Sequence, residues 1–252
     1  NGRMRFQTVT LKEPNKELMR TYRSGDSFPR EAFICAFDGE TAKTYEGMVS
    51  LSKGAVMSWT YIPGVQPSIM LEEFLECEET VKADAGFRKA LRKRAIMDVD
   101  LVMVDPWAAG HYGVPEEEGK RLLHTFCWLK ESKHDNGYVR PIEGLCPVVD
   151  LNAKKVVRLD DHGALPLPPE DGNYSRHFIK EYRTDLKPLE ITQPDGPSFT
   201  VEGKKVSWQN WQFRVGFTPR EGVVLHEIGF MDQGRLRPII YRASLAEMVV
   251  PY

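Results

Sequence analysis

The alternation of apolar residues with polar residues or glycine from Trp211 to Phe217 most constrains how this chain can fold. Apolar side chains occupy every second position of that run. Side chains of a β-strand point alternately to its two faces, so the run predicts a strand with one apolar face. Two more apolar runs, 223–230 and 235–242, flank a turn that contains Gly234 and predict a hairpin. This part of the chain is therefore expected to begin a large β-sheet whose remaining strands lie outside the sequence.

Two segments nearer the N-terminus, 47–59 and 147–159, share one pattern. Each contains a predicted strand, a tight polar turn and a second predicted strand. Between them, apolar residues recur at intervals of three and four from Leu71 to Leu91, which predicts helix. We therefore expect an α+β fold, with two small tandem α+β domains, each an antiparallel meander plus a helix, followed by the first strands of a large β-sandwich.

The expected domain boundaries follow changes in composition. Residues 1–70 are expected to form the first small α+β domain, without its leading helix, and residues 71–175 the second. Proline and glycine then recur at turn spacing with little periodicity, so residues 176–200 are expected to form an extended linker. Residues 201–252 are expected to be the beginning of the β-sandwich, which stops before it is complete.

Shorter elements are expected inside the second small domain. Apolar patterning predicts one strand over residues 100–105 and another over residues 124–130. Between these strands, the acidic and basic run at 115–123 predicts a short helical stretch.

The charge balance excludes two classes of partner. The chain has 34 basic and 36 acidic residues, a net charge of −2, so we expect neither a nucleic acid nor a membrane surface as partner. Its one basic cluster, 88–94, is expected on the solvated side of a helix whose apolar side carries Phe87 and Leu91. No apolar run approaches the roughly 18 residues that a membrane-spanning helix needs.

The four cysteines are expected to be free thiols in a reducing compartment. Cys35, Cys77, Cys127 and Cys146 are far apart, and three of them lie in apolar runs. A single bridge between Cys127 and Cys146 is the alternative, because predicted strands could bring the two side chains together.

Longer motifs carry a family resemblance. Three of them lie between residues 208 and 252: W-Q-N-W-Q-F, F-T-P-R-E-G-V-V-L-H and R-P-I-I-Y-R-A-S-L-A-E-M-V-V-P-Y. They resemble the start of the catalytic β-sandwich of the copper-containing, topaquinone-dependent primary amine oxidases. V-D-P-W-A-A-G-H-Y-G and R-P-I-E-G-L-C-P-V-V-D, upstream and in the same order, are similar to this family too, and the D-P-W form most resembles its fungal and peroxisomal branch. The two small domains would then be the second and third N-terminal domains of the family.

The resemblance implies a reaction and cofactors for a full-length parent protein. Such enzymes oxidise a primary amine with dioxygen to an aldehyde, ammonia and hydrogen peroxide, and they are homodimers. They hold copper through an H-x-H pair and a third histidine, and they form topaquinone from tyrosine in an N-Y-D or N-Y-E motif. The chain has no H-x-H, and its one Asn-Tyr pair, at Asn173, is followed by serine. We therefore expect this chain alone to bind no copper or topaquinone and to be inactive without the remainder of the catalytic domain.

Four aromatic residues match family positions at the active site or its access channel. The resemblance implies that the hydroxyl of Tyr252 hydrogen-bonds a quinone oxygen. It also places Trp107, Phe74 and Tyr138 on the wall of the amine channel, where aromatic rings favour ammonium ions through cation–π attraction. Plain core packing of Trp107, Phe74 and Tyr138 is the alternative.

Two polar motifs are expected to have no catalytic role. The segment from His226 to Phe230 begins like the zinc-protease motif H-E-x-x-H, but phenylalanine replaces the second histidine and the segment alternates like a strand. Asp160, Asp161 and the histidine after them are expected to form a solvated turn.

Two hypotheses about function follow from the sequence. The first is that the chain is part of a primary amine oxidase that works in a peroxisome or in the cytosol. The second is a non-catalytic binding or assembly module built from the small α+β domains. The second hypothesis has to explain the exposed sheet edge that a half-finished sandwich would leave.

Overall fold

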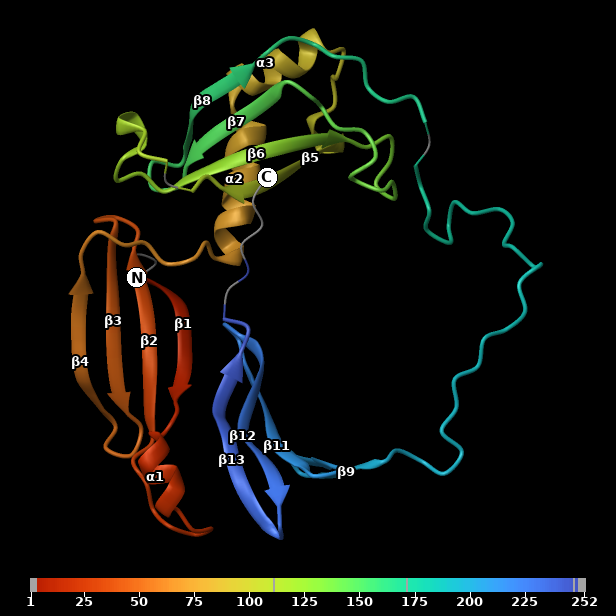
Figure 1. Ribbon diagram of the computed structural model, residues 1–252. Coiled ribbons are helices and arrows are strands. Elements are labelled where there is room, and N and C mark those ends of the chain that lie inside the picture. The colour runs from red at the N-terminus through yellow and green to blue at the C-terminus, as the bar shows by residue number, and fades with distance from the viewer. Residues whose placement is uncertain (1–3, 111, 171, 247, 249–252) are drawn as a thin grey trace. The chain divides into compact units, whose positions relative to one another are not determined.

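The computed structural model describes residues 4–110, 112–170, 172–246 and 248 (Figure 1). Within these ranges the chain is mostly β-sheet with few helices. It divides into two compact units. The helical unit contains Asp38–Lys43 and Gly64–Leu186. The two-sheet unit contains Met4–Phe37, Thr44–Pro63 and the described residues of Lys187–Tyr252.

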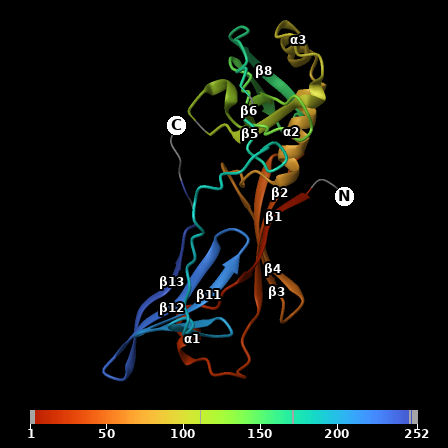
Figure 2. The same ribbon diagram turned by 90° about the vertical axis from the view of Figure 1, so that its right-hand side faces the viewer.

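The first sheet of the two-sheet unit has the strand order β1-β2-β3-β4 (Figures 1 and 2). Its strands are β1 (Met4–Lys12), β2 (Glu31–Asp38), β3 (Lys43–Ser50) and β4 (Ala55–Ile62). A short helix, α1 (Lys16–Thr21), follows β1 and is capped by the side chain of the preceding asparagine. The predicted β3–β4 hairpin is confirmed. β1 and α1 were not predicted from the sequence.

The second sheet of this unit has the order β13-β12-β11-β10-β9, and every neighbouring pair is antiparallel. Its strands are β9 (Phe199–Glu202), β10 (Lys205–Trp208), β11 (Trp211–Thr218), β12 (Gly222–Asp232) and β13 (Arg235–Ser244). The alternating run predicted to be a strand is β11, and the predicted hairpin is β12 and β13. Both predictions are confirmed.

The helical unit contains a third sheet, with strand order β5-β6-β7-β8, and two helices. The helices are α2 (Leu71–Ala83) and α3 (Ala85–Lys93). Asp84 separates them because its extended backbone ends α2, while its side chain accepts a 2.7 Å hydrogen bond from Phe87 N and caps α3. The strands are β5 (Val102–Ala108), β6 (Leu122–Leu129), β7 (Leu145–Asp150) and β8 (Lys155–Asp161).

Both helices pack on one face of this sheet (Figures 1 and 2). They contribute Cys77, Val81, Phe87 and Leu91 to a buried apolar cluster. The sheet contributes alternate residues of its strands, among them Val102, Val104, Leu123, Cys127 and Val149. The residues that alternate with these along β5 and β6 therefore point away from the helices.

Two details of the helical unit correct the sequence analysis. The predicted helical stretch at 115–123 is a single 3-10 turn, η2 (Pro115–Glu117), followed by Gly119 at φ +72°, and Leu122 already belongs to β6. A second 3-10 turn, η1 (Val99–Leu101), precedes β5. Arg94 is not on the solvated side of its helix, because its side chain is 4% exposed and pairs with Asp161.

The acidic run at the end of β8 is also not a simple solvated turn. Asp161 lies 2.8 Å from Arg94 Nη2 and 3.2 Å from Lys93 Nζ, while Asp160 pairs with Arg158 at 3.0 Å. The hydrogen bonds from Arg94, and after them those from Lys93, lower the pKa of Asp161 to about 2. Asp161 therefore links the end of α3 to β8, while Asp160 pairs within β8, and each carboxylate has a basic partner of its own.

Three further findings bear on the class of protein. All four cysteines are free thiols, as predicted. Residues 162–198 contain no helix or strand where the structure describes them. None of the helices in the described ranges has the length and apolar character needed to cross a membrane.

Candidate functional site

The face of the helical unit's sheet opposite α2 and α3 carries a set of side chains that do not belong to the core. β5 and β6 are antiparallel, and residues directly across such a pair share a face. Trp107 lies across from His124, Asp105 across from Phe126, and Met103 across from Trp128. We call this surface the helix-free face.

Four rings on or beside the helix-free face form an aromatic row: Trp107, Phe126, Trp128 and Tyr138. The ring centroids of Trp107 and Phe126 are 6.3 Å apart, as are those of Phe126 and Trp128, and those of Trp128 and Tyr138 are 5.2 Å apart. Each contact is edge-to-face, the geometry that the ring quadrupoles favour. Trp107, Phe126 and Tyr138 are 42%, 47% and 61% exposed. The row is therefore an accessible surface, and core packing of Trp107 and Tyr138 is not observed.

Asp105 places a carboxylate in the middle of the aromatic row. Its Oδ2 accepts a hydrogen bond of 3.0 Å from Trp107 Nε1 and one of 3.5 Å from the hydroxyl of Tyr138. The charge of Asp105 is the largest cause of a raised pKa at Tyr138. Two side chains that the sequence analysis selected separately are thus joined by a third residue that it did not select.

Phe126 and Trp128 are also functional candidates that the sequence analysis missed. Both lie in the run H-T-F-C-W-L-K, which was assigned to a strand from its apolar content. Alternation within that run puts Phe126 and Trp128 on one face and Cys127 on the other. Only the pairing of β6 with β5 shows that the two rings continue the line that Trp107 begins.

A buried ion pair fixes the segment that leads into α2. Arg121, the residue before β6, donates from Nε and Nη2 to the two carboxylate oxygens of Glu73, each at 2.7 Å. It also donates to the carbonyl oxygens of Pro67 at 2.9 Å and Ser68 at 3.1 Å. Glu73 accepts in turn from Met70 N at 2.8 Å, which closes the first turn of the helix. One guanidinium therefore ties the first turn of α2 and the segment before it to the residue that precedes β6.

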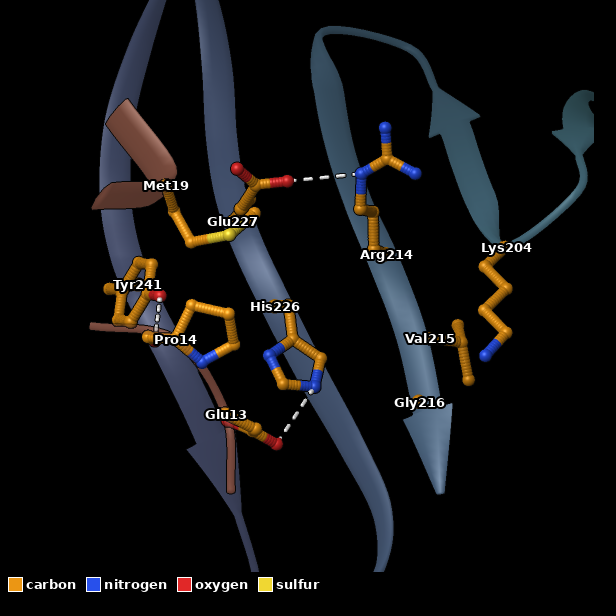
Figure 3. Close-up of a pocket in the computed structure, with 10 residues that line it drawn as sticks. All are labelled: Glu13, Pro14, Met19, Lys204, Arg214, Val215, Gly216, His226, Glu227 and Tyr241. Atoms are coloured by element: carbon orange, nitrogen blue, oxygen red, sulfur yellow. Dashed lines mark hydrogen bonds and ion pairs between the residues drawn. The ribbon is translucent and has the colours of Figure 1, made fainter. Parts of the chain in front are cut away.

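The two-sheet unit contains a pocket of about 210 Å³, drawn in Figure 3. It forms where the segment between β1 and α1 lies against β11, β12 and β13. Its lining residues are Glu13, Pro14, Met19, Lys204, Arg214, Val215, Gly216, His226, Glu227 and Tyr241. A Cβ at Gly216 would lie 2.9 Å from His226 Nε2, so glycine leaves the room that the imidazole occupies.

The charges in this pocket are mostly paired with one another. Arg214 Nε lies 3.0 Å from Glu227 Oε2, and His226 Nε2 lies 3.7 Å from Glu13 Oε1 (Figure 3). The hydroxyl of Tyr241 donates to the carbonyl oxygen of Pro14 at 3.2 Å. The contacts of Glu13 and Pro14 attach the segment after β1 to the second sheet, while Arg214 and Glu227 pair within that sheet. The pocket is therefore explained as packing between parts of one unit.

An ion-pair network beside the pocket strengthens this attachment. Arg242 lies 2.7 Å from Glu13 Oε2 and 2.6 Å from Glu221 Oε2. Ser244 Oγ also donates to Glu221, at 2.6 Å. The guanidinium of Arg242, followed by this hydroxyl, lowers the pKa of Glu221 to about 2.

The segment that resembles a zinc-protease motif is part of β12, as its alternation predicted. Two histidines at the spacing of H-E-x-x-H converge on a metal only on a helix. Glu227 pairs with Arg214 instead. Across the described ranges, no group of three or more His, Cys, Asp and Glu could hold a metal ion.

Comparison with known proteins identifies the family. Three family models match the chain in order: the copper amine oxidase N2 domain over residues 1–62, the N3 domain over 72–177 and the enzyme domain over 200–252. All three belong to one family, and together they leave only two short connecting segments unmatched. The chain belongs to the copper amine oxidase family. The aromatic row lies in the part matched by the N3 domain, and β9–β13 lie within or overlap the part matched by the enzyme domain.

Individual relatives agree with this assignment. The chain is 47% identical over 249 residues to a primary amine oxidase of Arthrobacter sp. (strain P1), a match that covers 98% of the chain and 38% of that enzyme. It is 38% identical over 289 residues to a peroxisomal copper-containing diamine oxidase of Nicotiana tabacum, covering 99% of the chain and 37% of that protein. The chain therefore spans somewhat more than a third of the length of these relatives.

A solved structure supports the fold. The crystal structure of a copper-containing benzylamine oxidase from Hansenula polymorpha matches with a TM-score of 0.74 at 28% identity, over 96% of this chain and 40% of that one. Such a match extends over the sheets of both units. The mostly-β architecture is thus that of a copper amine oxidase.

The residues that the family resemblance selected fall into three groups. Trp107 and Tyr138 are brought together in the aromatic row. Phe74 packs against the buried apolar cluster, from a helix on the other face of the sheet, so the structure does not bring it to the row. Tyr252 lies outside the described residues. The absence of a metal-binding group in the described part also means that the residues there do not fit a copper centre.

Proposed function

We propose that this chain supplies the N2 and N3 domains and the first enzyme-domain strands of a primary amine oxidase. The proposed reaction consumes a primary amine and dioxygen and yields an aldehyde, ammonia and hydrogen peroxide. The observation that carries the proposal is the ordered match of three domain models of one family along a single chain. A non-catalytic binding module, the second hypothesis from the sequence, is not favoured, because it does not account for an enzyme-domain match over residues 200–252.

The fold is proposed to divide as the sequence predicted. Residues 1–70 and 71–175 would be two small α+β domains, residues 176–200 a linker and residues 201–252 the beginning of the catalytic β-sandwich. The three family models begin and end close to these boundaries, which supports the division. Each of the two four-stranded sheets is formed by a segment of the chain that also contains helix, which supports the α+β description.

The cofactors are assigned to residues outside the described part of the chain. In such an enzyme, copper and topaquinone supply the electron acceptor for amine oxidation and the route to dioxygen. We propose that Tyr252 orients the quinone through a hydrogen bond from its hydroxyl group. The remainder of the catalytic domain would supply the copper ligands and the quinone tyrosine, and two such subunits would form a homodimer.

The role proposed for the N3 part is to guide the substrate. Trp107 and Tyr138 would line the amine channel, and their exposure on the helix-free face supports this role. Aromatic walls attract a cationic amine while they exclude bulky or branched ones. Phe74 is proposed as a third wall residue, although its packing against the core would limit it to one edge of the channel. Peroxisomal relatives support an intracellular location, in peroxisomes or the cytosol.

The experiment that tests this proposal is an intact mass of the protein from its natural source, followed by phenylhydrazine treatment. The expected result is a mass well above that of the 252-residue chain, with a coloured hydrazone on the same polypeptide. A protein with the mass of 252 residues and no coloured adduct would contradict the proposal and favour the binding module.

A further inference from the structure

Asp105 is a negative charge without a cationic partner in the part of the chain that the structure describes. Its hydrogen bonds come from Trp107 and Tyr138, which are neutral donors, and no lysine or arginine of the described residues lies within ion-pair distance. Arg158, on the same face at β8, is already paired with Glu117 at 2.8 Å and Asp160 at 3.0 Å. The charge of Asp105 is therefore available to a ligand.

The geometry leaves one oxygen of this carboxylate open. Both hydrogen bonds end on Oδ2, and Oδ1 accepts none from a described residue. The two donors come from different segments, one next to Asp105 on β5 and the other from the loop between β6 and β7. They fix the orientation of the carboxylate before any ligand arrives, which lowers the entropic cost of binding.

The surroundings of Oδ1 suit an organic cation better than a metal ion. A metal ion needs several oxygen, nitrogen or sulfur ligands, and no group of three or more His, Cys, Asp and Glu is present in the described ranges. An organic ammonium ion needs one carboxylate and apolar contact for its carbon chain. The half-exposed rings of Trp107 and Tyr138 offer that contact and cation–π attraction.

We propose that Asp105, flanked by Trp107 and Tyr138, binds the ammonium group of an organic amine. This inference deepens the proposed function and rests on it for its biological role, because it names a residue that would draw the cationic substrate into the channel. The half-buried carboxylate would increase the local concentration of the amine at the N3 part of the enzyme. Asp105 would act in substrate binding, and Trp107 and Tyr138 would position it.

The test is a binding titration of the 252-residue chain with n-butylammonium, with 1-butanol as the uncharged isostere. The readout is the NMR signal of the Trp107 indole N–H, assigned from its loss in Trp107→Phe. Butylammonium is expected to shift this signal with saturation, while butanol shifts it little. Raising the salt concentration from about 10 mM to about 500 mM is expected to weaken binding in the unmutated chain, because it shortens the Debye length from about 30 Å to a few ångströms.

Two variants separate the local charge from the overall charge. Asp105→Asn keeps an oxygen that accepts from Trp107 and Tyr138 but removes the charge, and it is expected to weaken butylammonium binding about fivefold. Glu143→Gln removes one charge from an exposed residue that makes no hydrogen bond or ion pair with described residues, and it is expected to bind like the unmutated chain.

Equal binding by Asp105→Asn and the unmutated chain would overturn the proposal, and so would equal binding of butanol and butylammonium. If Asp105→Asn does not fold, salt-independent binding by the unmutated chain would overturn it instead. None of these readouts needs turnover. If the protein forms a hydrazone but Asp105→Asn does not weaken butylammonium binding, the ammonium site is refuted and the proposed oxidase function stands. If no hydrazone forms but Asp105→Asn weakens binding, the oxidase function is refuted and the ammonium site stands.

Discussion

Replacing Arg121 with methionine should destabilise the helical unit more than any other single change to an ion pair of that unit. Arg121 and Glu73 are 1% and 3% exposed, and two hydrogen bonds of 2.7 Å join them. Two carbonyl oxygens, of Pro67 and Ser68, also accept from the guanidinium. Methionine fills most of the volume of arginine but donates no hydrogen bond, so the substitution isolates the loss of the charge and its donors.

The magnitude follows from what Arg121→Met leaves behind. The carboxylate of Glu73 keeps the hydrogen bond from Met70 N but loses its cation in a buried site. Removing one partner of a buried ion pair costs about 3–5 kcal/mol, because the remaining charge is uncompensated. A loss of about 3 kcal/mol lowers the equilibrium constant for folding by roughly two orders of magnitude.

The assay is urea unfolding followed by far-UV circular dichroism, with Glu73→Leu and two further variants for comparison. Arg121→Met together with Glu73→Leu should cost clearly less than Arg121→Met alone, since no buried charge remains unpaired. Arg158→Met, which breaks a pair whose arginine is 45% exposed, should cost at most about 1 kcal/mol. A loss below about 1 kcal/mol for Arg121→Met, or a loss in the double variant equal to the sum for Arg121→Met and Glu73→Leu, would show that Arg121 and Glu73 do not stabilise each other in the fold.

Three other changes test the remaining structure. Arg242 lowers the pKa of Glu221 from 4.5 to about 2, so this carboxylate should stabilise the folded state fully above about pH 5 and lose its contribution as the pH falls toward about 2. Thermal unfolding of Glu221→Gln should therefore depend less on pH in that window, by about 1–2 kcal/mol in the free energy of unfolding. An unchanged pH profile would count against the ion-pair network. Burial raises the pKa of Cys127 to about 12, so its alkylation by iodoacetamide near neutral pH, followed by mass spectrometry, should be much slower than that of free cysteine, and equal rates would argue against its buried position. A Cβ at Gly47 would lie 2.6 Å from the ring of Trp59, so Gly47→Ala should cost about 1–3 kcal/mol in urea unfolding, and an unchanged midpoint would show that this ring does not cover the glycine.

Local patterns predicted the elements whose sequence alternates or recurs regularly. β11 and the β12–β13 hairpin follow from alternation and a glycine turn, and α2 and α3 follow from apolar residues at intervals of three and four. β1 was missed because apolar residues and threonine are mixed in Met4–Lys12, and its pairing with β2 is not visible in either strand alone. Arg121 was assigned to a helix because its neighbours are charged, although its partner is 48 residues away.

The candidate site was only partly predictable for the same reason. Trp107 and Tyr138 were selected because they match family positions. Asp105, Phe126 and Trp128 were not selected, because they join the site only through the pairing of β5 with β6 and the return of the following loop. Sequence patterns specify which face a side chain takes within one strand, but not which strand lies beside it.

The proposed oxidase function is tested most directly by amine-dependent formation of hydrogen peroxide and ammonia by the protein purified from its natural source. A small primary amine is expected to give both products in equal amounts, with consumption of dioxygen, and phenylhydrazine treatment is expected to abolish the reaction. A protein of the length of its relatives that releases neither product from any primary amine would rule out the proposed function.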